Sequence, residues 1–223
     1  MENIVKNYLA FGLVFVGLVV VVSVMVRGLI KKYTKKFQDL STSSGVTGRE
    51  FVRVVLKAED LEVGVDETKS VYQSEFLWRK GMIRIPNLDR SSLLTLGLSA
   101  HELGHAGQVK DNMLLAATIS FIERTGKYLS YFFPLIMVSG LTFYSPLLPV
   151  SLIVYFLILL ILLVKIPFEV EASSRGLSYI EQYTGLTEKE RARLKKFLWL
   201  AILTRLTDLT VGFLAVFWLN DQR

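Results

Sequence analysis

Hydrophobic runs alternate with polar segments along the chain, and the first run predicts a membrane anchor. LAFGLVFVGLVVVVSVMV, residues 9–26, carries no charged side chain and is long enough to cross about 30 Å of hydrocarbon. The residues before it are nearly neutral, and lysines and arginine cluster just after it, at residues 27–36. A cleaved signal peptide, the alternative, would have a basic start and a shorter apolar core. We therefore expect a retained anchor, with the N-terminus outside and the basic cluster in the cytoplasm.

A second hydrophobic region, residues 128–164, is too long for one crossing of the bilayer. TFYSPLLP, residues 142–149, interrupts it with two prolines and no charge, which predicts a short outer turn between two antiparallel helices. The last hydrophobic run, residues 197–219, contains Arg205 and Asp208. Charged side chains inside a bilayer are costly. This run therefore either crosses with both groups facing protein or water, or lies at the membrane interface.

The polar segments between these runs predict short regular elements. STSSGVTG, residues 41–48, predicts a flexible joint that ends in a helix cap, and residues 49–60 have helical apolar spacing. EVGVD at 62–66 and GMIRIP at 81–86 predict strands. The exposed edge of the second strand could pair with an extended peptide, and a purely structural hairpin is the alternative. TEKE at 187–190 matches a capping box that opens a basic helix.

Composition narrows the class of protein further. The chain contains no cysteine, which excludes disulfides, thiolate metal sites and a cysteine nucleophile. Its net charge is +6, and the cations cluster beside the hydrophobic runs, which favours a membrane surface over nucleic acid as the partner. A glycine-rich phosphate loop and internal repeats are both missing from the sequence.

Both histidines of the chain lie in one motif, LSAHELGHAGQ, residues 98–108. A helix capped by Asp89 or Ser91 and running through this motif would place His101 and His105 on one face, one turn apart. Two imidazoles in that arrangement can bind one divalent cation. Because no thiolate is available, ligands drawn from imidazole and carboxylate favour zinc, without excluding other divalent metals.

The residue after the first histidine, Glu102, predicts the chemistry of this site. It would project beside the metal, where it can take a proton from water that the ion activates. The alternative is a purely structural role, in which the two histidines are packed and hydrogen-bonded. Gly104 favours the metal site, because glycine in a helix costs about 0.5–1 kcal/mol against alanine, and the close approach of another backbone or a ligand would offset that cost.

A catalytic zinc site usually has three protein ligands, and the third must here be an aspartate or glutamate. The best source is PFEVEASSRG, residues 167–176, in which Pro167 suits the first turn of a new helix. We favour Glu169 as the ligand, since small residues share its face and would let this helix approach the histidine helix closely. Glu171 points away, towards solvent or Arg175. The alternative is that Glu169 only complements the helix dipole.

HELGHAGQ followed by FEVEASSRG resembles the YugP-like neutral zinc metallopeptidases, a family of bacterial membrane proteases, and the likeness covers most of the chain. The chain is more distantly similar to the heat-shock and CAAX-processing membrane metalloproteases, whose third ligand opens an E-x-x-x-D motif. That ligand falls on Glu169, and Ser173 stands at the closing aspartate. The resemblance implies a gluzincin-like peptidase with His101, His105 and Glu169 as ligands of one Zn2+ ion and Glu102 as the base.

A zinc peptidase also needs a donor for the oxyanion of its transition state. Arg175 and Arg205 are candidates, as are Tyr72 and Tyr179, and each could equally be a surface or structural residue. Gln108 follows the second histidine by three residues and is a candidate for supporting it from outside the ligand set.

These observations predict a mainly α-helical integral membrane protein. Transmembrane helices would pack with a small cytoplasmic α+β, zincin-like catalytic region that carries the HExxH helix. The expected segments are an N-terminal transmembrane anchor (1–30), a catalytic region with the HExxH helix (31–127), a transmembrane hairpin (128–165), a cytoplasmic helix with the third ligand (166–196) and a C-terminal membrane or interfacial helix (197–223).

The predicted function is zinc-dependent endopeptidase activity in the inner, cytoplasmic membrane, with several crossings and the active site on the cytoplasmic side. The expected partners are polypeptide substrates, such as membrane or misfolded proteins, and the lipid bilayer, but no nucleic acid. The alternative is a non-catalytic membrane scaffold or transporter accessory with a structural or vestigial zinc site. The sequence makes no prediction of oligomeric state.

Overall fold

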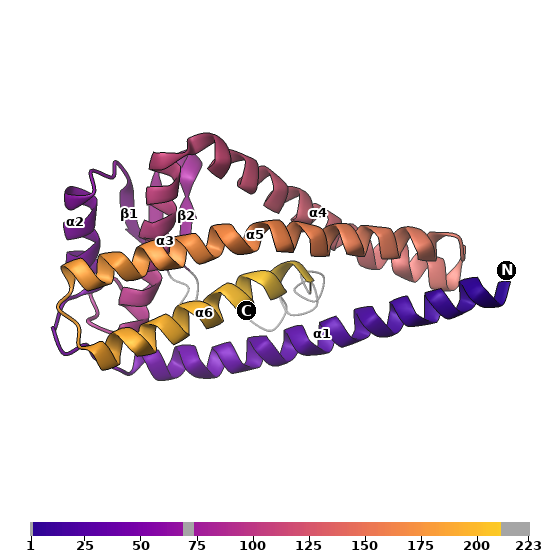
Figure 1. Ribbon diagram of the computed structural model, residues 1–223, viewed down its shortest axis with the longest axis horizontal. Helices are drawn as coiled ribbons and strands as arrows, with labels where there is room; N and C mark the ends of the chain where they lie inside the picture. The colour runs from indigo at the N-terminus through magenta and orange to yellow at the C-terminus, as the bar shows by residue number, and fades with distance from the viewer. Residues whose placement is uncertain (1, 69–73, 211–223) are drawn as a thin grey trace. The chain divides into compact units, whose positions relative to one another are not determined.

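The computed structural model describes residues 2–68 and 74–210, and these residues are mainly helical with one small sheet (Figure 1). They form two compact units. The first unit contains residues 2–29, 119–166 and 203–210, and the second contains residues 30–118 and 167–202.

The sheet of the second unit has three short strands, β1 (Gly64–Glu67), β2 (Glu75–Leu77) and β3 (Met82–Ile85). Their order is β1-β3-β2, with β1 parallel and β2 antiparallel to β3. The strand predicted at 81–86 is confirmed, but its predicted exposed edge is wrong, because both edges of β3 are paired. The edge positions belong to β1 and β2, and the periodicity of one strand could not indicate which segments would pair with it.

Two capped helices accompany this sheet: α3 (Leu93–Asp111) packs against β2 and β3, and α2 (Gly48–Ala58) packs against α3. Thr47 and Glu50 form a capping box at the start of α2, which confirms the predicted cap. The predicted cap of the histidine helix is wrong. Ser92 occupies that position and accepts a hydrogen bond from the backbone N–H of Thr95, whereas Asp89 pairs with Arg49.

Helix α3 is the centre of the second unit, because 15 of its 19 residues are buried. A helix that is buried on all sides must pack against several neighbours at once. Its apolar side chains join one core with residues from α2, the sheet, the second half of α5 (Leu147–Tyr183) and α6 (Glu188–Thr210). The histidine motif is therefore fixed in the most buried part of this unit.

Helix α5 runs without interruption through Pro167, so the predicted start of a new helix at this proline is wrong. Proline removes one backbone hydrogen bond and crowds the preceding turn, which is why it favours helix starts over interiors. Within α5, the residues up to Ile166 belong to the first unit and the residues from Pro167 belong to the second. Apolar residues with helical spacing lie before and after the proline, so that one continuous helix contains residues of both units.

The first unit contains parts of α1 (Glu2–Gln38), α4 (Met113–Thr142) and α5. Residues 143–146 join α4 to α5, which confirms the predicted short turn. Phe133 and Tyr155 pack with ring centroids 4.9 Å apart in a small core, and the buried Lys165 pairs with Glu123 at 2.8 Å.

Among the described residues, one helix, α5, is long and apolar enough to span a membrane by length and composition. This finding gives one candidate span by length and composition alone, and the several crossings that the sequence predicts stay a prediction. The capping box predicted at the start of α6 is confirmed by the hydrogen bonds between Thr187 and Glu190. The side chains of Arg205 and Asp208 and the end of the last hydrophobic run lie outside the described residues.

Candidate metal centre

Two histidines and one glutamate converge in the second unit. Helix α3 places His101 and His105 one turn apart, with ring centroids separated by 4.7 Å. From α5, Glu169 Oε2 lies 3.3 Å from His101 Nε2 and 3.6 Å from His105 Nε2. The three ligand atoms all lie within 4.8 Å of one another, so they could hold a single metal ion.

The chemistry of these atoms fits a divalent cation. His101 and Glu169 are 3% and 2% exposed, and His101 Nε2 makes no hydrogen bond. Burial is the largest influence on the pKa of His101 and lowers it, and the carboxylate of Glu169 offsets part of this effect. A neutral imidazole presents a lone pair to a carboxylate oxygen, an arrangement that a cation between them would stabilise. The separation of 3.3 Å between His101 Nε2 and Glu169 Oε2 also suits two bonds of about 2.0–2.1 Å in a tetrahedral site.

Each histidine is oriented by a partner on its other ring nitrogen. Ser173 Oγ lies 3.0 Å from His101 Nδ1, and Gln108 Oε1 lies 2.9 Å from His105 Nδ1. The amide of Gln108 also donates from Nε2 to the backbone oxygen of Phe168 at 2.9 Å. Because this amide nitrogen must face acceptors, its oxygen faces the imidazole, and His105 carries its proton on Nδ1. Both Nε2 atoms are thereby directed towards Glu169.

One glycine on α3 and one on α5 explain how Glu169 reaches the histidines. A Cβ on Gly104 would collide with the backbone of Ala172, and a Cβ on Gly176 would collide with the backbone of Ala100. The close helix approach predicted from the small residues is confirmed. Glu169 lies one turn before Ala172 on α5, so this crossing brings its carboxylate to the histidine face.

The glutamate of the motif, Glu102, is 1% exposed, and its Oε1 accepts a hydrogen bond of 2.7 Å from Ser74 Oγ. Ser74 could not be recognised from the sequence, because a lone serine at the end of a polar segment carries no chemical signal. Phe168 was not predicted either, and its ring stacks on His105 with centroids 5.4 Å apart. The position of Phe168 directly before the favoured ligand was the one available indication.

The neighbouring acid Glu171 lies outside the ligand cluster. Its two oxygens accept from Arg175 Nη2 at 3.0 Å and from Gln108 Nε2 at 3.1 Å. Arg175 also donates to Asp111, so two carboxylates hold the guanidinium of this candidate oxyanion donor. A chain of contacts thus runs from Arg175 through Glu171 and Gln108 to the ring of the second histidine.

The remaining candidate donors to the oxyanion are two tyrosines and a second arginine. Tyr179 is 6% exposed, and its hydroxyl lies where a Cβ on Gly107 would point. Burial raises the pKa of Tyr179, which keeps the phenol protonated at neutral pH. Tyr72 and the side chain of Arg205 lie outside the described residues.

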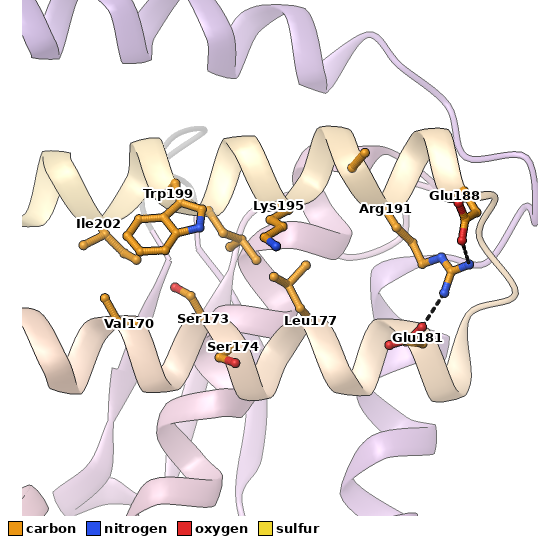
Figure 2. A pocket seen from close by; sticks show the side chains of 12 residues that line it. Val170, Ser173, Ser174, Leu177, Glu181, Glu188, Arg191, Lys195, Trp199 and Ile202 are labelled. Atoms are coloured by element: carbon orange, nitrogen blue, oxygen red, sulfur yellow. Dashed lines mark hydrogen bonds and ion pairs between the residues drawn. The ribbon is translucent and has the colours of Figure 1, made fainter.

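A pocket of about 510 Å³ lies between α5 and α6 (Figure 2). One end is lined by apolar residues that include Trp199, and the other end is lined by the ion pairs of Arg191 with Glu181 and Glu188. Ser173 belongs to both places, since it lines the pocket and contacts His101.

The sequence of the chain matches one known protein family. A family model described as "Putative neutral zinc metallopeptidase" matches residues 12–219. The chain belongs to this family. No curated protein and no solved structure matches the chain. Membership in this family supports peptidase activity in general terms and implies zinc and a polypeptide substrate. The cluster of two histidines and one glutamate could hold the ion.

Proposed function

We propose that this metallopeptidase is a membrane-embedded endopeptidase of the HExxH…E type. His101, His105 and Glu169 hold one zinc ion, and Glu102 is the general base. The observation that carries the proposal is the convergence of both Nε2 atoms on one carboxylate oxygen, at 3.3 Å and 3.6 Å. Three nitrogen and oxygen ligands with no thiolate are typical of catalytic rather than purely structural zinc sites.

The chain's own residues account for the proton movements of peptide hydrolysis. When bound, zinc supplies positive charge that lowers the pKa of water and polarises a peptide carbonyl. Glu102 takes a proton from the attacking water as the water oxygen bonds to the carbonyl carbon. The same proton then passes to the nitrogen of the scissile bond, the C–N bond breaks, and the remaining water proton transfers to the departing amine, so that a carboxylate and an ammonium group leave.

The edge of the sheet offers a place for the substrate. Among the described residues, strand β2 pairs with β3 and with no second strand, and Ser74, the residue directly before it, contacts Glu102. An extended peptide that adds to β2 as a further strand would therefore pass close to the base. This mode of binding suits unfolded or extended segments of many sequences, which agrees with membrane or misfolded proteins as substrates.

Exposed apolar side chains support a membrane location. In the most apolar window of α5 only 28% of the residues are buried, whereas the core helix of a water-soluble protein would be mostly buried. Large apolar side chains are also exposed on the parts of α4 and α5 in the first unit, namely Phe132, Leu135, Val138, Ile153, Phe156, Leu160 and Leu163. Surfaces of this kind mark contact with lipid or another protein.

We propose several crossings of the cytoplasmic membrane, with the metal centre on the cytoplasmic side. Because the chain has no cysteine, single cysteines can test this topology cleanly. Ser145→Cys, in the turn between α4 and α5, should react with an impermeant maleimide on intact cells. Ser44→Cys, also exposed, should react only after permeabilisation. The opposite labelling pattern would invert the proposed orientation, and labelling of both positions on intact cells would exclude it.

Zinc content and proteolysis together test the catalytic proposal. The full chain, purified in detergent, should contain one zinc ion and cleave casein or a model membrane protein. Glu102→Gln should keep the zinc and lose cleavage by about 100-fold or more. Glu169→Ala should lose both zinc and cleavage. The matched control is Glu181→Ala, an exposed glutamate of the same helix, which should keep both.

Three results would contradict the proposal in different ways. Full cleavage by Glu102→Gln would show that Glu102 is not the general base. Full zinc in Glu169→Ala together with loss of zinc in Glu171→Ala would move the third ligand. A zinc-loaded wild type that cleaves nothing, and is indifferent to Glu102→Gln, would indicate a non-catalytic membrane protein with a structural metal.

A further inference from the structure

A buried hydrogen bond links the proposed base to a residue outside the metal motif. Ser74 Oγ donates to Glu102 Oε1 at 2.7 Å, and the two residues are 7% and 1% exposed. They lie 28 positions apart in sequence. A carboxylate at this depth needs hydrogen-bond donors. Hydroxyl-to-carboxylate bonds of this length are among the stronger ones in proteins.

The backbone next to Ser74 is anchored on its sheet side. Ser74 directly precedes β2, which pairs with β3 in the register Glu75 to Arg84. Arg84 Nη1 also contacts Glu75 Oε1 at 3.2 Å, and Arg84 Nε lies 3.9 Å from Asp66 Oδ2 on β1. One arginine thereby links all three strands beside the serine, which holds its hydroxyl in a defined place.

We propose that Ser74 is a positioning residue for the general base. Its hydroxyl fixes one oxygen of Glu102 and so sets the plane of the carboxylate, which leaves the other oxygen directed at the attacking water. This inference rests on the proposed function. A base that rotates freely about its last torsion angle spends less time in reach of the proton, so the loss of Ser74 lowers kcat rather than substrate binding.

A purely structural role for Ser74 predicts different behaviour. In that case its removal would lower stability or zinc content, and activity would fall only as folded, loaded enzyme is lost. The positioning role predicts a change in kcat per zinc-loaded molecule, with KM and zinc content unchanged.

The test uses the full chain in detergent and three variants. Ser74→Ala removes the hydroxyl and Ser74→Thr keeps it. Ser151→Ala is the matched control, since Ser151 is fully buried and, among the hydrogen bonds of the described residues, its hydroxyl donates to the backbone of its own helix, at 2.7 Å to Leu148. We expect Ser74→Ala to lower kcat by about tenfold or more, with KM and zinc unchanged. Ser74→Thr should keep most of the kcat, and Ser151→Ala should keep all of it.

A second readout is independent of activity. In the metal-free chain, thermal unfolding of Ser74→Ala, Glu102→Gln and the double variant forms a double-mutant cycle. We expect the double variant to lose less stability than the sum of the two single variants. Additive losses would show that the two residues do not interact and would overturn the proposal, as would an unchanged kcat in Ser74→Ala or loss of its zinc. An inactive, zinc-loaded wild type would instead overturn the proposed function itself.

Discussion

Gly104 of α3 lies directly against the backbone of Ala172 of α5, and any side-chain carbon on the glycine would collide with the alanine carbonyl group. The same relationship recurs one turn along, where Gly176 of α5 faces the carbonyl group of Ala100. Backbone atoms cannot rotate away as a flexible side chain can. The two glycines therefore set the separation of the helices that carry the three proposed ligands.

Gly104→Ala is expected to damage the metal centre more than the fold. The added methyl group must push α5 away from α3, which costs about 1–3 kcal/mol of stability and withdraws Glu169 from the imidazoles. Zinc affinity, measured by competition with a chelator, should fall by at least about tenfold. Gly28→Ala in α1 is the control, because a Cβ there meets nothing within 4 Å. It should leave the affinity unchanged and stabilise its helix slightly. Unchanged zinc affinity in Gly104→Ala would mean that the helix crossing does not set the ligand geometry.

Ser173→Ala should weaken zinc binding through His101. The hydroxyl of Ser173 lies 3.0 Å from Nδ1 of this histidine, and partners at that position fix the ring and its tautomer. We expect zinc affinity to fall by about 10- to 100-fold. The control is Ser174→Ala, its exposed neighbour, which also lines the pocket of Figure 2 but has no contact with the histidine among the hydrogen bonds of the described residues. Equal effects of the two variants would assign the loss to the pocket rather than to the imidazole.

Gln108→Leu tests the other imidazole. Leucine has a similar volume but cannot accept from His105 Nδ1 or donate to Phe168, and both contacts are 2.9 Å long. Two part-buried groups thereby lose these hydrogen bonds. Zinc affinity should fall by about 10- to 100-fold. Gln182→Leu, at an exposed position of α5, should bind zinc like the wild type. If Gln108→Leu binds zinc normally, the orientation of the second histidine does not depend on this amide.

The sequence predicts the local part of the candidate site well. The spacing of His101 and His105 is enough to place two rings on one helix face, because that relation depends only on helix geometry. The small residues that follow Glu169 indicate a close approach of two helices, and the collisions at Gly104 and Gly176 agree with it. These features are properties of one helix face each, which is why they can be recognised without knowing the fold.

The features that the sequence could not predict depend on distant partners. Pro167 favours a helix start locally, yet α5 continues through it, because packing over a long helix outweighs one lost hydrogen bond. The alternation in β3 predicts a strand with one buried face, but it does not indicate that two separate segments pair with it. Ser74 reaches Glu102 only because the sheet carries it to α3. Neither the composition nor the periodicity of a segment indicates which distant segment it will contact.

Glu190 is expected to make the stability of the second unit depend on pH. Burial alone would raise its pKa, but hydrogen bonds from Ser43 and Thr187 outweigh burial and lower the pKa to about 2, from an ordinary value of 4.5. Ser43 donates from both its backbone nitrogen, at 2.7 Å, and its hydroxyl, at 2.6 Å. This carboxylate therefore joins the loop before α2 to the start of α6.

The direction of the pH effect follows from the lowered pKa. A group with a lower pKa in the folded state stabilises the fold above its unfolded pKa, and that contribution is lost as the pH falls through the folded value. We expect Glu190→Gln to lower the free energy of unfolding of the metal-free chain by roughly 1–3 kcal/mol at pH 6–7. The difference from wild type should shrink as the pH falls from about 4.5 towards 2. Glu188→Gln, whose side chain is 95% exposed on the same helix, should show neither effect. A difference for Glu190→Gln that stays constant down to pH 2 would show that the charge of Glu190 does not stabilise the fold.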